Sequence, residues 1–337
     1  PEADGIEGAS VIQSVKLPFL STMCYPQARS LTDLEAEAKR APLISAHSFY
    51  RYHSLWVHQA FKRWGTPYWH VPHGILDPYV LTYGRGIKQA FLKMGGRRFL
   101  EECACTIFAT KREWEKAESV FGPMRGEVVH WPVDLVDTSD HAARRQSIRE
   151  LLGIPSEAKV LLYFGRVQAM KRPLETIEAV ASMRSDHLHL VMIGPEEGIS
   201  EKDVRAKADS VGLKNFHWVG PVFGEQKYDY LLASDAYVSF SIRENFNHTA
   251  AESLAAGLPV ILSQGNDLGP EIAAANAGWY LSDDRPAAFK QAIEDFLSLD
   301  APALAERGAC GRAFIQQECS FAGFQQRLLE LAAQYGR

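Results

Sequence analysis

The stretch 243–261 reads Arg-Glu-Asn-Phe-Asn-His-Thr-Ala-Ala-Glu-Ser-Leu-Ala-Ala-Gly-Leu-Pro-Val-Ile, and it separates two carboxylates, Glu244 and Glu252, by seven residues. An apolar strand pattern at 236–240 precedes this stretch, and the apolar residues of 250–256 predict a helix. Glu244 therefore lies in a polar loop at the carboxyl end of a strand, where ligands bind in open α/β sheets. This position favours a binding role for Glu244.

The second carboxylate, Glu252, has two interpretations. Thr249-Ala-Ala-Glu252 matches a capping box, with Gly257 as a C-cap and Pro259 just beyond it. A capping glutamate needs no ligand. The motif alone leaves capping and ligand binding open, whereas the pairing with Glu244 favours binding.

Cations follow another strand pattern, 160–164, which ends in Gly165-Arg166 and is followed by Lys171-Arg172 just before a helical pattern. Cations ahead of a helix N-terminus oppose the helix dipole, so a phosphate lying between them and the helix would explain their position. Gly165 permits close backbone approach, Arg166 offers a bidentate fork and Lys171 a point charge, as a diphosphate requires. The alternative is a solvated loop.

Apolar runs alternate with amphipathic stretches along the whole chain. In the first part the strand patterns are 9–15, 42–46, 67–71, 106–110 and 127–131, and the helical patterns include 54–64 and 113–120. After a charged, loop-like stretch at 136–149, further strand patterns follow at 160–164, 188–193, 215–219, 236–240, 259–262 and 278–280. This alternation predicts an α/β protein with parallel sheets covered on both faces.

At 337 residues the chain is long enough for two cores, so we predict two Rossmann-like domains. The domains cover residues 1–134 and 135–320, and a last amphipathic helix, predicted at 321–335, lies in the segment 321–337. The net charge of −5 argues against broad binding of nucleic acid. The five cysteines lack the paired spacings of zinc sites, which fits a cytoplasmic protein without a structural metal. No apolar run is long enough to cross a bilayer.

Gly165-Arg166 with Lys171, and Glu244 with Glu252, resemble the nucleotide-sugar site of GT-B glycosyltransferases of family 4. The segments 45–47, Ser-Ala-His, and 72–78, Pro-His-Gly-Ile-Leu-Asp-Pro, resemble the acceptor-side domain of these enzymes. The resemblance covers nearly the whole chain. It implies two Rossmann-like domains facing a central cleft, with the final helix crossing back to the first domain. The family's first strand and glycine-rich loop have no counterpart before Ala9, so we expect the first domain to lack them.

By this resemblance, four residues are expected to take part in catalysis. Arg166 and Lys171 would hold the donor diphosphate and neutralise the leaving nucleotide. Glu244 would lie beside the donor sugar, and His73 would face that sugar from the opposite domain. Glu252 would accept hydrogen bonds from the ribose. The other expected donor-binding residues are Gly165, Val222, Asn245, Phe246, Asn247, His248 and Thr249.

One departure from the family concerns the residues around Phe246. Members commonly have glycines there, whereas in this chain Asn245 and Asn247 flank the phenylalanine. The approach of the backbone to the sugar is therefore expected to differ.

The resemblance implies a retaining, metal-independent glycosyltransferase that needs no cofactor. It would move a sugar from a nucleotide diphosphate sugar, with UDP or GDP as the nucleotide, to a hydroxyl of a glycan, lipid-linked or small-molecule acceptor, as in polysaccharide biosynthesis. Two alternatives are a nucleotide-sugar 2-epimerase of the same architecture and a non-catalytic nucleotide-sugar-binding protein. An NAD-dependent oxidoreductase is disfavoured, because no Gly-x-Gly-x-x-Gly follows a strand pattern.

Two further patterns leave alternatives open. His70 and His73 have a spacing that metal ligands use, but with no third ligand evident nearby we favour a packed histidine or a sugar contact. Basic residues interleave with apolar ones over 85–99, interrupted by Gly95-Gly96. This pattern predicts either peripheral contact with anionic lipid at the inner membrane face or a solvated helix face.

Overall fold

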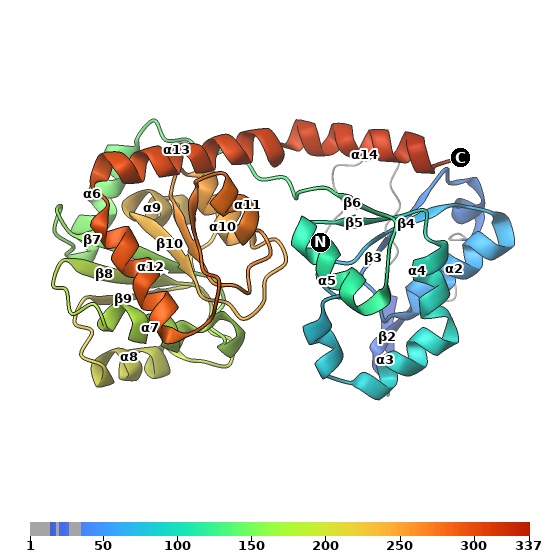
Figure 1. The fold of residues 1–337 in the computed structure, drawn as a ribbon, viewed down its shortest axis with the longest axis horizontal. Coiled ribbons are helices and arrows are strands. Elements are labelled where there is room, and N and C mark those ends of the chain that lie inside the picture. The colour runs from blue at the N-terminus through green and yellow to red at the C-terminus, as the bar shows by residue number, and fades with distance from the viewer. Residues whose placement is uncertain (1–13, 18–19, 27–34) are drawn as a thin grey trace. The chain divides into compact units, whose positions relative to one another are not determined.

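The computed structural model describes residues 14–17, 20–26 and 35–337, and the chain forms two compact units (Figure 1). Unit 1 contains the chain up to Val129 and again from Gln325 to Arg337, and unit 2 contains His130–Phe324. The domain boundaries predicted from the sequence, at 134 and 320, lie close to these divisions.

Unit 2 is built on one parallel sheet of six strands in the order β12-β11-β10-β7-β8-β9. Counted along the chain from β7, this is the doubly wound order of Rossmann folds, with the switch point between β7 and β10. All six strands agree with the sequence patterns, and they are β7 (Lys159–Phe164), β8 (Leu188–Ile193), β9 (Phe216–Gly220), β10 (Ala236–Ser239), β11 (Val260–Leu262) and β12 (Gly278–Tyr280).

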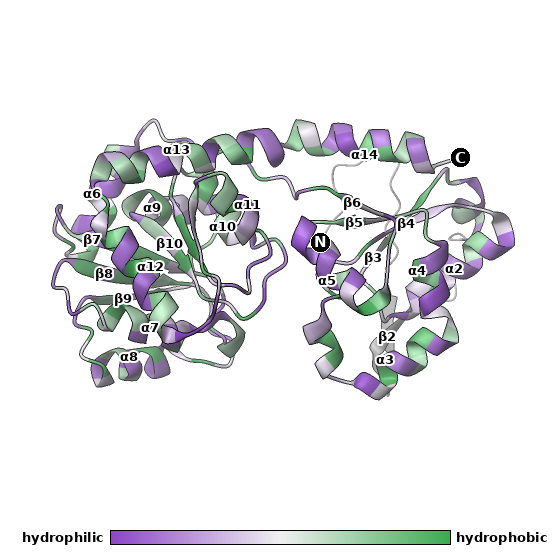
Figure 2. Ribbon diagram, viewed as in Figure 1, coloured by the Kyte–Doolittle hydropathy of each residue, from purple (hydrophilic) through white to green (hydrophobic). Residues whose placement is uncertain are grey.

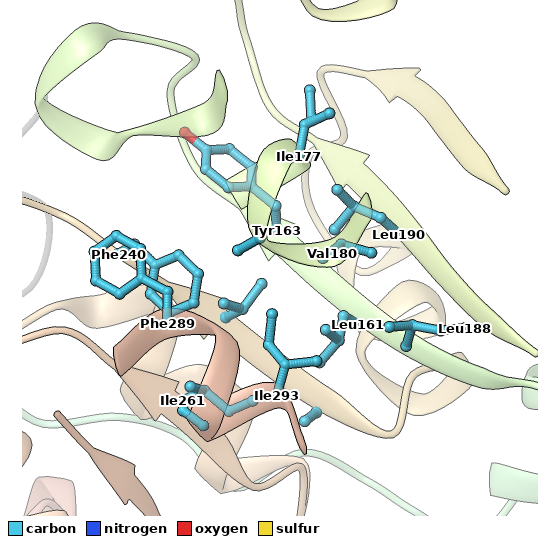
Figure 3. Packing of buried hydrophobic residues seen from close by; sticks show 14 of the residues in the cluster. Leu161, Tyr163, Ile177, Val180, Leu188, Leu190, Phe240, Ile261, Phe289 and Ile293 are labelled. Carbon is cyan, nitrogen blue, oxygen red and sulfur yellow. The ribbon is translucent and has the colours of Figure 1, made fainter. Parts of the chain in front are cut away.

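The helices of unit 2 cover this sheet with their apolar faces. Aliphatic residues of β7, β8 and β10 pack against Ile177, Val180 and Ile293 of the helices, and Phe240 stacks on Phe289 with ring centroids 4.0 Å apart (Figure 3). Figure 2 shows β10 in green, while α12 alternates between green and purple segments. The helices are α6 (His141–Leu152), α7 (Pro173–Ala181), α8 (Glu201–Ser210), α9 (Gln226–Ala233), α10 (His248–Ala255), α11 (Gly269–Ala274), α12 (Pro286–Ser298) and α13 (Ala301–Glu318).

The prediction of a loop at 136–149 is wrong from residue 141 onward, because α6 begins there and ends at Leu152. Its charges suggested solvent exposure, but Arg149 is only 4% exposed. The Arg149 guanidinium donates to Asp235 Oδ2 at 2.7 Å and to the carbonyl oxygen of Ala158 at 2.9 Å. The polar residues of this stretch therefore belong to a helix, and the arginines of that helix form hydrogen bonds with the rest of unit 2.

Unit 1 contains a parallel sheet in chain order, β3-β4-β5-β6. Its strands are β3 (Ile44–His47), β4 (Tyr68–Val71), β5 (Cys105–Phe108) and β6 (Gly126–Val128), and its helices include α2 (Tyr52–Trp64), α3 (Arg85–Phe91), α4 (Arg97–Glu102) and α5 (Lys111–Phe121). An antiparallel pair, β1 (Ser14–Leu17) and β2 (Leu20–Pro26), forms a sheet of its own. Of the strand predicted at 9–15, residues 9–13 lie outside the described residues.

The final helix, α14 (Phe321–Tyr335), has the bounds expected from the sequence. It begins in unit 2 and belongs to unit 1 from Gln325 onward. Arg327 donates to Glu127 Oε2 at 2.7 Å, and Arg337 donates to the carbonyl oxygen of Lys39 at 2.7 Å. These contacts bind the chain's last residues to the sheet and helices of unit 1.

Asp235→Ala tests the buried ion pair that holds α6. We expect the free energy of unfolding to fall by about 3–5 kcal/mol, because Arg149 would keep a buried charge without its partner. Urea unfolding followed by circular dichroism measures this loss. Asp229→Ala is the matched control, because its partner Arg144 is more exposed, and we expect a loss of about 1 kcal/mol. Equal losses in the two variants would contradict a special role for the Asp235 pair.

Candidate functional site

The loops that follow β7 and β10 meet at the switch point of the unit 2 sheet. The backbone N–H of Ile242 donates to the carbonyl oxygen of Met170 at 2.8 Å, which joins the two loops. Lys171 Nζ donates to Glu244 Oε1, and both side chains are 16% exposed. The structure thus brings together a cation and a carboxylate that the sequence placed in two separate motifs.

The backbone beside this ion pair is open on one side and closely packed on the other. Gly165 has a φ of +155°, and no heavy atom lies within 4 Å of where its Cβ would stand. Gly194, at the end of β8, has a φ of +142°, and a Cβ there would lie 1.8 Å from the carbonyl oxygen of Gly165. Glycine at 194 therefore lets the strand ends pack closely, and glycine at 165 leaves room for a ligand to approach the backbone.

The other cations of the expected anion site are also paired with carboxylates. Arg166 Nη1 donates to both carboxylate oxygens of Glu197, at 2.7 and 2.9 Å, with both side chains exposed. Arg172 pairs with Asp284 at 3.1 Å. A phosphate is therefore not required to explain these cations, because the fold supplies a carboxylate to each one.

The capping box considered for Thr249 is not formed, because α10 begins at His248 and its N-cap is Asn247, two residues before Thr249. Asn247 Oδ1 accepts from the backbone N–H of Ala250 at 3.2 Å, while the Thr249 hydroxyl donates to Asn247 Oδ1 at 2.8 Å. Glu252 has a different partner, because Lys227 Nζ donates to its Oε1 at 2.7 Å. Burial disfavours the charge on Lys227, but the bond to Glu252 raises the Lys227 pKa above its usual value.

A buried network of amides holds the loop between Glu244 and α10. Asn247 Nδ2 donates to Asn266 Oδ1 at 2.6 Å, and Asn266 Nδ2 donates to the carbonyl oxygen of Ser239 at 3.1 Å. The Glu244 backbone N–H also donates to the carbonyl oxygen of Gly265 at 2.9 Å. Asn247 has a φ of +56°, a conformation that asparagine tolerates better than most residues. Asparagine can therefore occupy this left-handed position.

The remaining expected donor-binding residues differ in exposure. Phe246 is buried and its ring lies 5.0 Å from that of His248, which is exposed. Asn245 and Thr249 are half-buried, as is Val222, in the loop after β9. Because the side chains of Phe246 and Asn247 are buried, only their backbone remains for a ligand. Partial desolvation of the His248 ring lowers its pKa below the usual value.

His73 follows β4 at the carboxyl edge of the unit 1 sheet. Its Nε2 lies 2.9 Å from Nδ1 of His47, with the ring centroids 5.2 Å apart and the ring planes inclined by 23°. Next to it, the Gly74 backbone N–H donates to Glu113 Oε1 at 2.5 Å. His73 and Glu244 belong to different units, so the expected contact of His73 with the donor sugar stays a prediction.

His70 lies in β4 and is buried. Its Nε2 lies 3.0 Å from the carbonyl oxygen of Ser48, and its ring packs against Phe49 and Phe99. His70 and His73 therefore have separate partners. Within the residues that the structure describes, no three His, Cys, Asp or Glu side chains are grouped as metal ligands.

Sequence reasoning missed two residues that support these edges. Lys227 contacts Glu252 from α9, and no local pattern singles it out. Glu113 accepts hydrogen bonds from the backbone N–H groups of Gly74 and Ala109. The spacing of Thr110 and Glu113 indicates only a helix start, and Thr110 does cap α5. The contact between Glu113 and Gly74 depends on the tertiary fold, so sequence spacing could not reveal it.

His70 makes the stability of the protein depend on pH. Burial lowers its pKa to about 3, so below pH 6.5 the unfolded chain binds a proton that the folded protein does not. The stability present above pH 6.5 is therefore lost as the pH falls, by about 2 kcal/mol at pH 5 for this residue alone. Urea unfolding at pH 7.5 and pH 5 should show a smaller loss in His70→Leu than in the unsubstituted protein. The same loss in both would contradict the assignment.

Comparisons of the sequence identify similar proteins. A family model described as "Glycosyl transferases group 1" matches residues 144–313. A D-inositol 3-phosphate glycosyltransferase of Streptomyces avermitilis is 30% identical over 285 residues, covering 80% of this chain and 60% of that protein. A protein of the same name from Mycolicibacterium smegmatis is 25% identical over 287 residues, covering 82% of this chain and 65% of that protein. The chain thus spans about 60–65% of the length of these relatives.

Comparison of the structure gives the same fold in several solved proteins. A sucrose-phosphate synthase of Thermosynechococcus elongatus has a TM-score of 0.71 at 21% identity, covering 91% of this chain and 76% of that chain. The Anabaena protein HepE, in complex with UDP and glucose, has a TM-score of 0.70 at 14% identity, covering 95% of this chain and 84% of that chain. The predicted fold class, α/β with two Rossmann-like units as in GT-B glycosyltransferases, is confirmed. No helix in the described part of the chain has the length and apolarity to span a bilayer.

Proposed function

We propose that this chain transfers a sugar from a nucleotide diphosphate sugar to a hydroxyl of an acceptor. The proposal starts from the family, because the chain belongs to the glycosyl transferases group 1 family. One observation carries the proposal. Lys171 and Glu244 contact each other at the switch point of a doubly wound sheet, beside the open backbone of Gly165. Such a point is where doubly wound folds bind nucleotides.

Binding of the donor exchanges the partners of these charges. The diphosphate takes the place of Glu244 at Lys171 and of Glu197 at Arg166. The carboxylate of Glu244 then accepts hydrogen bonds from hydroxyls of the sugar. In the same way Glu252 exchanges Lys227 for the ribose hydroxyls. The charged groups at the site, Lys171, Arg166, Glu244 and Glu252, thus each gain a ligand group of suitable polarity.

The reaction breaks the bond between the sugar and the diphosphate, and negative charge develops on the leaving nucleotide. Lys171 and Arg166 are fixed cations at that position, and they stabilise the developing charge in place of a metal ion. The carboxylate of Glu244 stabilises positive charge at the anomeric carbon. Retention of the anomeric configuration, and UDP or GDP as the nucleotide, are further parts of the proposal that follow from the family resemblance.

The acceptor is a hydroxyl of a glycan, a lipid-linked saccharide or a small molecule. Two curated relatives carry D-inositol 3-phosphate in their names, so a phosphorylated cyclitol is the first small acceptor to test. The two alternatives from the sequence predict other outcomes with the same donor. A 2-epimerase converts the nucleotide sugar without an acceptor, and a non-catalytic protein binds the nucleotide without turnover.

Unit 1 carries a surface suited to an anionic membrane, and contact with such a membrane is part of the proposal. Residues 78–100 include five Lys or Arg and no Asp or Glu, in a chain of net charge −5. Tyr83, Ile87 and Met94 are 62%, 69% and 60% exposed among these cations. The two phenylalanines of the same segment, Phe91 and Phe99, are buried in the core. Isolated apolar side chains among cations bind the interface of anionic bilayers.

Lys171→Met tests the donor site. We expect the affinity for UDP or GDP to fall by about 10- to 100-fold, because a charge-assisted contact contributes about 1.5–3 kcal/mol. Titration calorimetry measures the affinity. Lys207→Met is the matched control, because Lys207 pairs with Glu178 on the helices α8 and α7 and is not part of the proposed site. Unchanged affinity in Lys171→Met would remove Lys171 from the donor site.

Product analysis then separates the functions. Incubation with UDP- and GDP-sugars, with and without a cyclitol phosphate or glycan acceptor, should release nucleotide in an acceptor-dependent manner. Epimerised donor without acceptor would support the 2-epimerase. Tight binding without turnover of any donor would favour the non-catalytic protein.

Ile87→Asp tests the membrane surface. Cosedimentation with vesicles that contain phosphatidylglycerol should fall several-fold, because the variant loses an apolar contact and gains a repelled charge. Leu151→Asp is the matched control, because Leu151 is equally exposed, at 71%, but lies on α6 of unit 2. Vesicles of phosphatidylcholine alone should bind neither protein. Equal binding by the two variants would contradict a role for this surface.

A further inference from the structure

We propose that Arg172 is a positioning residue for Lys171. The guanidinium of Arg172 is held by the fold and is not offered to the donor. It fixes the turn from which Lys171 extends into the proposed donor site. The role of Arg172 in nucleotide binding rests on the proposed function, whereas its effect on the Lys171 side chain does not.

The backbone at Arg172 has an uncommon conformation. Arg172 has a φ of +51° and a ψ of +50°, in the left-handed region where residues other than glycine are uncommon. Pro173 follows, and a residue before proline prefers extended backbone. Strained backbone of this kind persists where the surrounding contacts enforce it, and it clusters at functional sites. An arginine at this position therefore requires contacts that compensate the strain.

Backbone hydrogen bonds on both sides enforce this turn. The N–H of Arg172 donates to the carbonyl oxygen of Ala169 at 3.1 Å and ends the short 3₁₀ helix η3 (Ala169–Lys171). The carbonyl oxygen of Arg172 accepts from the backbone N–H of Thr176 at 3.0 Å and from the Thr176 hydroxyl at 2.8 Å. The turn at Arg172 therefore joins the short helix that carries Lys171 to α7.

The side chain of Arg172 contacts three segments of unit 2 and is only 18% exposed. Its Nη1 lies 3.1 Å from Asp284 Oδ2, in the loop between β12 and α12. Nη1 also donates to the carbonyl oxygen of Phe240, directly after β10, at 3.4 Å. The guanidinium carbon lies 5.7 Å from the ring centroid of Phe289 on α12, which is a cation–π distance. The Phe289 ring stacks in turn on Phe240 (Figure 3).

Asp284 depends on this contact. Arg172 is the only ion-pair partner of the Asp284 carboxylate in the described part of the chain, and Asp284 Oδ1 is buried there without a hydrogen bond. A phosphate that took Arg172 away would leave this carboxylate unpaired, and a charge shielded from water is costly without a partner. Arg166 differs, because its partner Glu197 is exposed. The exchange of partners proposed at Arg166 is therefore disfavoured at Arg172.

Lys171 is held on both sides by the segment that follows β10. The backbone N–H of Ile242 donates at 2.8 Å to the carbonyl oxygen of Met170, the residue before Lys171. Arg172, the residue after Lys171, donates to the carbonyl oxygen of Phe240. The same segment leads to the carboxylate that Lys171 binds. The two hydrogen bonds therefore hold the Lys171 backbone at a fixed distance from the loop that carries its partner.

The reactivity of the Lys171 amine tests this role without any nucleotide. Arg172→Gly removes the side chain and leaves a residue that adopts this φ without strain. Acylation of Lys171 by limiting reagent, followed by mass spectrometry, should become several-fold faster, because Glu244 then holds the amine less firmly. Lys227 is the internal reference, since it is 21% exposed and also paired with a carboxylate. An unchanged rate at Lys171 overturns the proposal.

Arg184→Gly is the matched control. Arg184 follows the other end of α7 and has the same φ of +51°, but its side chain is exposed. In the described part of the chain it forms no ion pair with a carboxylate. This variant loses the same charge and relieves the same backbone strain, so the reactivity of Lys171 should stay as it is. An equal rise in Arg184→Gly would indicate a general effect of charge or strain, and the proposal would fail.

Asp284→Ala separates positioning from direct binding by the sign of its effect. If Arg172 acts through the fold, the loss of its carboxylate partner loosens the turn and lowers the affinity for UDP or GDP. If Arg172 bound the diphosphate, the loss of a competing carboxylate would raise that affinity. Titration calorimetry should show binding weaker by about 3- to 10-fold, as for residues coupled in one network. Equal or tighter binding contradicts the proposal.

A double-mutant cycle with Lys171→Met completes the test. Arg172→Gly alone should weaken nucleotide binding about tenfold, but by less than about twofold in the Lys171→Met background, because the cation through which it acts is gone. Fully additive losses would mean that Arg172 itself contacts the nucleotide, which overturns the proposal. If the unsubstituted protein binds no nucleotide while Lys171 reacts faster in Arg172→Gly, the proposed function fails and the positioning of Lys171 stands.

Discussion

One constraint governs unit 2, which is that six parallel strands end at the same edge of the sheet. At the switch point between β7 and β10, the chain continues from the two strands to helices on opposite faces of the sheet. Side chains and backbone groups line the space between the two strand ends. Lys171 and Glu244, far apart in the chain, are adjacent in this space. Beside this space Gly194 permits the close packing of the ends of β7 and β8, and the backbone of Gly165 is open. The amide network around Asn247 then holds the Glu244 loop in place.

The charges at this edge are neutralised in pairs, and the pairs differ in how readily they separate. Arg166 and Glu197 are both about half exposed, so their ion pair contributes little and breaking it costs little. Lys171 and Glu244 are 16% exposed, so neither can lose its partner without a replacement. A ligand that brings only phosphate compensates Lys171 but leaves Glu244 without a donor. A ligand that also brings sugar hydroxyls compensates both, so under the proposed function this pair favours the complete donor over the bare nucleotide.

The sequence predicts much of this architecture because the strands are buried and their apolar runs are unambiguous. All six strands of unit 2 and the final helix appear where the patterns place them. The helix α6 was missed because the arginines that suggested solvent are bound by Asp235 and by carbonyl oxygens far along the chain. The N-cap of α10 is Asn247 and not Thr249 for a similar reason, because Asn247 forms a hydrogen bond with a buried partner, Asn266. Local patterns indicate elements well, but they do not indicate which polar groups will meet.

The carboxyl edges of the two sheets have opposite chemistry, and this difference has a physical cause. In unit 2 the edge carries ionised side chains, each held by an opposite charge. In unit 1 the edge carries His47, His53 and His70, whose pKa values are lowered chiefly by burial, which disfavours their charged forms. A charged edge can exchange its partners for phosphate and ribose. Imidazole rings whose charged form is disfavoured hold phosphate poorly by charge, and they suit hydroxyl groups, which form hydrogen bonds without a counter-charge.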